Sequence, residues 1–297
     1  MQFIKVALFR WYYRWANRRA WKTTDFSDIS SRDMAVGGEA GELPARLYQP
    51  KSIDDGAGLV VYFHGGGWVI GDLETHDGFC RRLTQDTGNV VLAIDYRLAP
   101  EAVYPAAALD CIAATRWAIA HRVELGTGSG PLIVAGDSAG ANLSAVVAQQ
   151  LGAELDGQCL IYPVTRHYEP PTQSYLDNAT GYVLTLSVMQ WFWDSYYPLN
   201  GEPLTADNVP LAVLEGVSPR NDTTAAMVIT AQHDPLLDEG NAYAAALQQA
   251  GIACEHHYYP GEQHGFVCSE GRTGGHNDAM EKITRWMKSL PAAGEPA

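Results

Sequence analysis

Residues 132–145 read L-I-V-A-G-D-S-A-G-A-N-L-S-A, and this stretch decides the fold. An apolar run of strand type ends at Gly136, and apolar residues resume at helical spacing after Gly140. Glycines two residues either side of Ser138 indicate a turn so tight that side chains there would collide with the neighbouring strand and helix. The serine hydroxyl is therefore expected at a helix N-terminus, where free N–H groups and the helix dipole favour negative charge. A pentapeptide is too short to decide a function by itself, so its context must support it.

The composition indicates one large α/β domain with an insertion. The chain has 297 residues, of which 46% are hydrophobic, and a formal charge of -14. That charge argues against a nucleic-acid partner and favours neutral or cationic ligands. The five cysteines are odd in number and form no C-x-x-C pair, so we expect neither a disulfide framework nor a zinc site, and a cytoplasmic location fits best. No apolar stretch approaches the roughly 20 residues that span a bilayer, and the charges near the N-terminus argue against a signal peptide.

The first 25 residues are basic, unlike the rest of the chain. Helical spacing predicts a basic stripe made of Arg10, Arg14 and Arg18. It also predicts an apolar stripe made of Ile4, Leu8, Trp11, Tyr12 and Trp15. We expect the aromatic stripe to pack onto the rest of the protein. A weak contact of this basic helix with an anionic membrane surface is the alternative.

From Gly41 onward, runs of strand type alternate with runs of helix type, which is typical of a mostly parallel sheet with helices on both faces. Strands are expected over residues 43–49, 58–63, 89–95, 131–135, 157–162, 225–230 and 253–259. Helices are expected over residues 76–87, 104–122, 139–151, 236–250 and 276–290. Residues 163–219 interrupt this alternation and include an aromatic-rich helix around residues 188–197. A connection that long is usually a lid or a binding loop.

A glycine run follows the expected strand 58–63. His64-Gly65-Gly66-Gly67-Trp68 lets the main chain approach a substrate closely, and its backbone N–H groups can point at a developing oxyanion. We expect His64 to brace this loop and not to accept a proton.

An acid and a base follow two later strands. Asp234 comes after the strand 225–230 and His264 after the strand 253–259. Catalytic groups in open α/β sheets gather at the carboxyl ends of the strands. The chain order Ser138, Asp234, His264 is that of the α/β-hydrolases and differs from the order in other serine hydrolase folds. Asp238 is the alternative acid, but it lies a turn into the next helix.

These residues resemble the hormone-sensitive-lipase-like family of α/β-hydrolases, particularly its bacterial acetyl esterases and carboxylesterases. The motifs that carry the resemblance are His64-Gly65-Gly66-Gly67, Gly71-Asp72-Leu73-Glu74-Thr75-His76-Asp77, Asp95-Tyr96-Arg97-Leu98-Ala99-Pro100-Glu101, Gly136 to Gly140, Asp234 to Asp238, and His264-Gly265-Phe266. The resemblance implies an α/β-hydrolase fold: a mostly parallel central sheet of about eight strands with helices on both faces and a helical cap.

The resemblance also assigns roles to residues. It implies that the backbone amides of Gly66, Gly67 and Ala139 form the oxyanion hole. It implies a single domain, with a cap made of residues 1–33 and 163–219 on a catalytic core of residues 34–162 and 220–290. Glu262-Gln263 departs from the apolar residues that relatives often carry before the base.

Together the residues predict a serine carboxylesterase that hydrolyses short-to-medium acyl esters through an acyl-enzyme on Ser138, with no metal or organic cofactor. Trp68 and Val69 beside the glycine run and Trp191 in the expected cap are the candidate substrate-binding residues, because they could close a small acyl pocket. The alternative is that these aromatic side chains only pack the cap onto the core. An amidase, lactonase or thioesterase would use the same groups and stays open. A non-catalytic small-ligand receptor on this fold is disfavoured, because Ser138, Asp234 and His264 are all present. The sequence assigns neither the role of Asp137 nor the oligomeric state.

Overall fold

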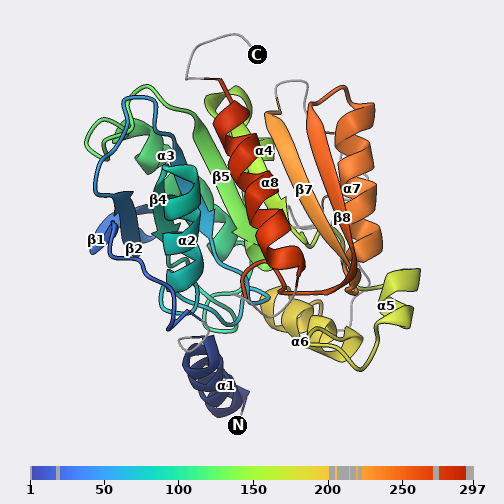
Figure 1. Cartoon of the computed structure of the whole chain (residues 1–297). Coiled ribbons are helices and arrows are strands. Elements are labelled where there is room, and N and C mark those ends of the chain that lie inside the picture. The colour runs from blue at the N-terminus through green and yellow to red at the C-terminus, as the bar shows by residue number, and fades with distance from the viewer. Residues whose placement is uncertain are drawn as a thin grey trace.

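The computed structural model describes residues 2–17, 21–200, 223–269 and 274–291, together with positions 205, 214 and 219. Within this part of the chain an eight-stranded sheet has the order β1-β2-β4-β3-β5-β6-β7-β8 (Figure 1). The strands are β1 (Ile29–Gly38), β2 (Gly41–Pro50), β3 (Leu59–Phe63), β4 (Val90–Ile94), β5 (Leu132–Asp137), β6 (Gly157–Ile161), β7 (Ala225–His233) and β8 (Cys254–Gln263). Strand β2 pairs antiparallel with β1 and β4, and all other pairs are parallel. The predicted fold class is confirmed.

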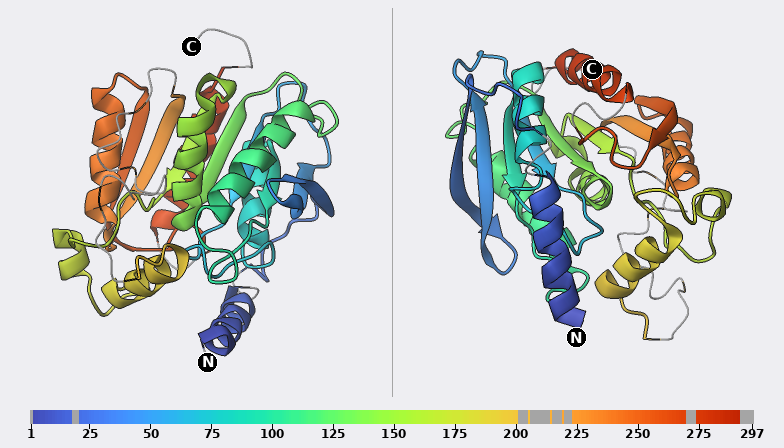
Figure 2. Two further views of the ribbon diagram at one scale, coloured as in Figure 1. Left: turned by 180° about the vertical axis from the view of Figure 1, so that it is seen from behind. Right: turned by 60° about the horizontal axis from the view of Figure 1, so that its bottom comes forward.

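Helices cover both faces of the sheet. They are α2 (Asp77–Thr87), α3 (Ala106–Ala120), α4 (Ala139–Leu151), α7 (Leu237–Gln249) and α8 (Gly275–Ser289). Helices α2 and α8 lie on one face, and α3, α4 and α7 lie on the other (Figures 1 and 2). Each face has its own apolar core, because side chains alternate along a strand. In β3, for example, Val61 belongs to the cluster under α3 and α4, and Val60 to the cluster under α2 and α8.

Strand β1 is absent from the sequence-based prediction. It pairs with β2 along the edge of the sheet, and only Ile29 and Val36 among its side chains are buried. Such a strand gives no alternating apolar pattern. The expected boundary between cap and core at residue 33 therefore falls inside this strand.

Three helices lie beyond the edge of the sheet at which β5 and β7 end (Figure 1). They are α1 (Gln2–Asn17), α5 (Gln173–Asp177) and α6 (Leu186–Tyr196). Helix α6 is the aromatic-rich helix that the sequence indicates. Much of the predicted insertion beyond residue 200 lies outside the described residues, as do residues 18–20 of the N-terminal segment.

Helix α1 packs with the face opposite to the one expected. Arg10 donates from Nε to the Val69 carbonyl at 2.7 Å and pairs with Glu101 at 2.8 Å, and Arg14 donates to Asp72 at 2.6 Å. The apolar stripe is largely exposed: Leu8 at 63%, Trp11 at 66%, Tyr12 at 55% and Trp15 at 45%. The expectation that this stripe packs onto the protein is wrong for these four residues; the side chain of Ile4 and all of Arg18 lie outside the described part of the chain.

The physical reason for this orientation is the set of acceptors that the two guanidinium groups reach. Arg10 Nη2 also donates to the Ala99 carbonyl at 2.9 Å, so this side chain binds two carbonyls and one carboxylate. Hydrogen bonds to charged groups are about twice as strong as neutral ones. None of the described helices is both long enough and apolar enough to cross a membrane.

Candidate active site

The turn between β5 and α4 places Ser138 at the start of a helix. Ser138 has a φ of 55°, in the left-handed region that non-glycine residues rarely adopt. A Cβ atom on Gly140 would lie 1.9 Å from the Phe63 carbonyl oxygen, and one on Gly136 would lie 2.5 Å from the same atom. Both glycines are therefore required by the close approach of the turn to β3, for the reason that the sequence indicated.

The structure brings Ser138, His264 and Asp234 together. His264 Nε2 lies 3.0 Å from Ser138 Oγ, and His264 Nδ1 lies 2.6 Å from Asp234 Oδ2. A carboxylate can only accept, so Nδ1 carries a proton and Nε2 is free to accept the proton of the serine hydroxyl. This is the arrangement of a nucleophile, a general base and a group that orients the base.

The acid is fixed more firmly than the base. Asp234 is 1% exposed, and its Oδ1 accepts a hydrogen bond from the Leu236 N–H at 2.9 Å. Asp238, the alternative acid, instead accepts from the Ser174 N–H at 2.8 Å and lies in the first turn of α7. The imidazole of His264 rests against the Tyr162 ring, with centroids 4.5 Å apart. Asp234 thus contacts the base, and Asp238 joins α7 to α5.

The glycine run lies beside the nucleophile, and two of its backbone amides are unused. Gly66 and Gly67 have φ values of 123° and 58°, and a Cβ atom on Gly67 would lie 2.1 Å from the Phe192 ring. No hydrogen bond within the described residues uses the N–H groups of Gly66, Gly67 or Ala139. Ala139 is the first residue of α4, where helical N–H groups have no partner inside the helix. The three amides that the family resemblance implies are therefore free to bind an oxyanion.

His64 lies where a brace is needed. Its carbonyl accepts from the Tyr96 hydroxyl at 2.6 Å, and its Nδ1 lies 2.8 Å from the Gly65 carbonyl oxygen. Its ring stacks on Tyr96 with centroids 4.4 Å apart. Burial and the neighbouring His76 lower the pKa of His64 to about 4. A neutral, stacked imidazole matches the expectation that His64 supports the loop.

Asp137, which the sequence left unassigned, contacts the glycine run. Its Oδ1 accepts from the Gly65 N–H at 2.8 Å and from the Tyr62 hydroxyl at 2.6 Å, and it lies 3.3 Å from His76 Nε2. Burial by itself would raise the pKa of Asp137, but His76, Tyr62 and the Gly65 amide together lower it to about 2. Asp137 is thus an ionised carboxylate beside the nucleophile.

Glu262, one of the two departures from relatives, does not face the base. Its Oε1 accepts a hydrogen bond from the N–H of Gly275, the first residue of α8, at 2.8 Å. A carboxylate is stabilised at a helix N-terminus by free N–H groups and the helix dipole. The charge of Glu262 is therefore directed toward α8.

A cavity of about 410 Å³ opens over Ser138. Its apolar wall comes from both cap segments and from the loop after β3: Phe9, Tyr12 and Tyr13 of α1, Val188 and Phe192 of α6, and Leu184 and Ile70. Its polar wall includes Thr75, His76, Asp137 and Gln263. The volume falls within the range of about 300–1,000 Å³ that is common for small-molecule sites.

The three predicted substrate-binding residues do not line this cavity. Trp68 and Val69 are fully buried, and the Trp68 ring stacks on Tyr196 with centroids 4.5 Å apart. Trp191 packs edge-on against Phe9 at 5.8 Å. The main chain has positive φ at Gly67 and Trp68, so it turns there and the indole packs against α6. Trp68 thus joins the loop after β3 to α6, and Trp191 joins α6 to α1, while the wall of this cavity is made by other side chains.

Helical spacing identifies the wall that replaces them. Val188 and Phe192 lie four residues apart on one face of α6 and line the cavity, whereas Trp191, three residues after Val188, borders that face and packs against Phe9. The aromatic-rich sequence of α6 therefore indicated a helix near the site, but it could not show which of its side chains line the cavity.

Comparison with known proteins gives consistent results. Residues 60–268 match the family model described as alpha/beta hydrolase fold. The chain is 41% identical over 251 residues to a carboxylic ester hydrolase of Mycobacterium tuberculosis, an alignment that covers 80% of this chain but 65% of that protein. It is 38% identical over 235 residues to an ethyl acetate hydrolase of Pseudomonas putida, covering 76% of this chain and 71% of that protein. A solved structure of an esterase from Pyrobaculum calidifontis has a TM-score of 0.87 and 34% identity, covering 96% of this chain and 93% of that one.

Proposed function

This chain belongs to the α/β-hydrolase-fold family, as a carboxylic ester hydrolase of the hormone-sensitive-lipase-like type, and we propose that it hydrolyses short-to-medium acyl esters through an acyl-enzyme on Ser138. One observation carries the proposal. Ser138, His264 and Asp234 are hydrogen-bonded in series, and Ser138 lines a cavity of about 410 Å³. The backbone N–H groups of Gly66, Gly67 and Ala139 beside it make no hydrogen bond within the described residues.

In the first half of the proposed reaction, Ser138 Oγ attacks the carbonyl carbon while its proton passes to His264 Nε2. The carbonyl oxygen becomes an oxyanion, which accepts hydrogen bonds from the N–H groups of Gly66, Gly67 and Ala139. Asp234 holds the imidazole in the correct tautomer and stabilises its positive form. His264 then protonates the leaving alcohol as the bond between carbon and the alcohol oxygen breaks.

In the second half, water attacks the acyl-enzyme in the way that Ser138 attacked the ester. His264 Nε2 takes a proton from the water as its oxygen attacks the acyl carbon, and the same amides hold the second oxyanion. Collapse of this intermediate breaks the bond to Ser138 Oγ, and the proton returns from His264 to the serine. The acid product then leaves the cavity.

The walls of the cavity support a neutral substrate of modest size. Phe9, Val188 and Phe192 provide apolar surface, and the ionised Asp137 beside Ser138 disfavours an anionic group there. The ethyl acetate hydrolase among the relatives acts, by its name, on a small neutral ester. We therefore place the preferred acyl chain at about two to six carbons, as the family resemblance also implies.

The experiment that tests this function is a rate series over p-nitrophenyl esters of increasing acyl length, with the corresponding anilides as amide substrates. We expect kcat/KM to be highest for short acyl chains and ester turnover to exceed amide turnover. Ser138→Ala should fold and lose activity by several orders of magnitude, because the three residues act as one unit. Near-wild-type ester hydrolysis by Ser138→Ala, or a preference for emulsified long-chain lipids, would overturn the proposal.

We also propose that the cap consists of α1 and the insertion that carries α5 and α6, and that the protein works in the cytoplasm. All five cysteines are free thiols, which supports a reducing compartment. If α1 contacts an anionic membrane surface weakly, the exposed Leu8, Trp11 and Trp15 would make that contact, because Arg10 and Arg14 pair within the protein. Co-sedimentation with anionic vesicles, compared between the native chain and Trp11→Ser, tests this contact; equal sedimentation of the two proteins would contradict it.

A further inference from the structure

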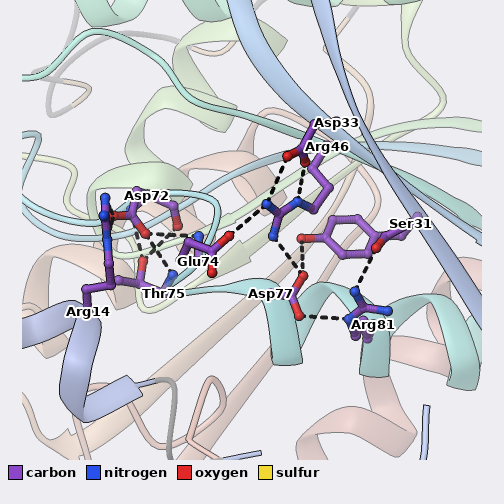
Figure 3. Close-up of polar contacts among 10 residues, drawn as sticks. Arg14, Ser31, Asp33, Arg46, Asp72, Glu74, Thr75, Asp77 and Arg81 are labelled. Carbon is purple, nitrogen blue, oxygen red and sulfur yellow. Dashed lines mark hydrogen bonds and ion pairs between the residues drawn. The ribbon is translucent and has the colours of Figure 1, made fainter. Parts of the chain in front are cut away.

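A continuous series of polar contacts leads from cap helix α1 toward the nucleophile. Arg14 Nε donates to Asp72 Oδ2 at 2.6 Å (Figure 3). Asp72 Oδ1 in turn accepts from the backbone N–H groups of Glu74 at 2.9 Å and Thr75 at 2.8 Å. The Asp72 carboxylate therefore fixes the loop that leads into α2 and ties it to α1.

Thr75 and His76 continue the series into the buried interior. Thr75 Oγ1 lies 2.8 Å from His76 Nδ1, and His76 Nε2 lies 3.3 Å from Asp137 Oδ1. The side chains of His76 and Asp137 are 4% and 8% exposed. Because an ionised carboxylate only accepts, Nε2 of His76 carries the proton in this contact. A hydrogen bond between charged or partly buried groups is worth more than one at the surface.

Asp137 transmits these contacts to the oxyanion loop, which we define as residues 64–67. Its Oδ1 accepts from the Gly65 N–H at 2.8 Å. Gly65 precedes the two glycines whose free amides face the cavity, and a Cβ atom on Gly65 would lie 2.3 Å from Asp137 Oδ2. The carboxylate thus contacts the first glycine of the loop both by a hydrogen bond and by close packing.

We propose that Asp72, His76 and Asp137 are positioning residues that hold the oxyanion loop in its productive geometry, and that the docking of α1 through Arg14 acts on the same loop. The inference rests on the proposed function, because it concerns how the amides of Gly66 and Gly67 are placed for ester hydrolysis. These side chains act through the backbone and need not touch the reacting atoms. The cap helix is then more than a wall of the cavity, since its attachment affects the oxyanion hole.

The expected effects decrease with distance from the loop. Loss of one oxyanion donor in a serine hydrolase lowers kcat by about 10²–10³-fold, and donors that are displaced but present should cost less. We expect kcat to fall about a hundredfold in Asp137→Asn, about tenfold in His76→Ala and about threefold in Arg14→Gln, with KM for a short ester nearly unchanged. His76→Gln, which keeps an N–H donor directed at Asp137, should recover most of the loss.

The distinguishing measurement is the inhibition constant of a short-chain alkyl trifluoromethyl ketone. Its hemiketal with Ser138 places an oxyanion in the hole, so its affinity should weaken by the same factor as kcat/KM in each variant. Arg81→Gln is the matched control: it removes an ion pair with Asp77 and a hydrogen bond to Ser31 in the neighbouring network of Figure 3, which does not contact Asp137. It should leave both quantities unchanged.

Two results would overturn the inference. One is wild-type kcat in His76→Ala and Arg14→Gln, and the other is a loss of kcat without a matching loss of affinity for the ketone. If Asp137→Asn does not fold, the His76 and Arg14 variants still decide the question. Failure of the proposed function looks different, because the wild-type protein itself would then neither hydrolyse the ester nor bind the ketone.

Discussion

The nucleophile turn and cap helix α1 line the same cavity, but they are held by different kinds of contact. At the turn, the main chain lies so close to β3 that Gly140 has no room for a methyl group, and every residue of β5 is buried. Helix α1 is held by the guanidinium groups of Arg10 and Arg14 and by one fully buried apolar side chain, Val6, while Trp11 and Leu8 are exposed. The reacting groups therefore belong to tightly packed backbone, and part of the cavity wall is attached by side chains that can be changed without opening the core.

The largest loss of activity is expected from a change of Asp234, the acid that orients His264. Asp234→Asn should fold normally but lower kcat by about 10⁴-fold, because an amide cannot hold His264 in the tautomer that accepts the serine proton. Asp238→Asn is the matched control, since Asp238 contacts the backbone of Ser174 instead of the base. Steady-state kinetics with thermal unfolding of both variants checks this. A greater loss of kcat in Asp238→Asn would contradict the assignment.

A single methyl group at the turn should affect folding. Gly140→Ala places a Cβ atom 1.9 Å from the Phe63 carbonyl oxygen, so we expect it to lower the free energy of unfolding by about 3 kcal/mol or more. Gly56→Ala has open space and should stay within about 0.5 kcal/mol of the wild type. Urea unfolding measures both, and equal stability of the two variants would show that the turn is not closely packed.

Acid should weaken the polar contacts beneath the turn. The pKa of Asp137 is lowered from 3.8 to about 2, so the folded state favours the ionised form relative to the unfolded state. This contributes about 2 kcal/mol of stability above pH 4, which is lost as the pH falls from about 4 to about 2. The difference in unfolding free energy between wild type and Asp137→Asn should narrow between pH 5 and pH 3. If the difference in unfolding free energy between the two proteins does not change with pH, the ionised Asp137 carboxylate is not the source of this stability.

The smallest effect is expected from changes in cap helix α6, on the preference for acyl-chain length. Phe192 lies against Gly67 and lines the cavity, so Phe192→Ala should raise the relative kcat/KM for longer acyl chains by about five- to tenfold, roughly 1 kcal/mol. Trp191→Ala removes a ring that does not line the cavity but packs against Phe9 and Phe192, so it should shift the acyl preference less. Kinetics over an ester series compares them. If the acyl preference shifts equally in both variants, Phe192 has no specific role in limiting acyl length.

The contrast between the nucleophile turn and helix α1 also explains how much of the structure could be predicted from the sequence. The positions of Ser138, Asp234 and His264 follow from local signals, since tight turns require glycine and parallel strands end at one edge. Amphipathic spacing in α1 showed two faces, but the acceptors that bind Arg10 lie 59 to 91 residues away in the chain, and they determine that the basic face packs against the protein. The same holds for Phe192 and for the contact of His76 with Asp137, which depend on how distant segments meet. Strand β1 had too few buried side chains to give any signal.

The most direct test of the central claim is covalent labelling with a fluorophosphonate probe, followed by mass-spectrometric mapping of the modified residue. We predict one adduct on Ser138 in the wild type, slower labelling in His264→Gln, and none in Ser138→Ala. An adduct on another residue, or an unlabelled Ser138 in a protein that still hydrolyses esters, would contradict it.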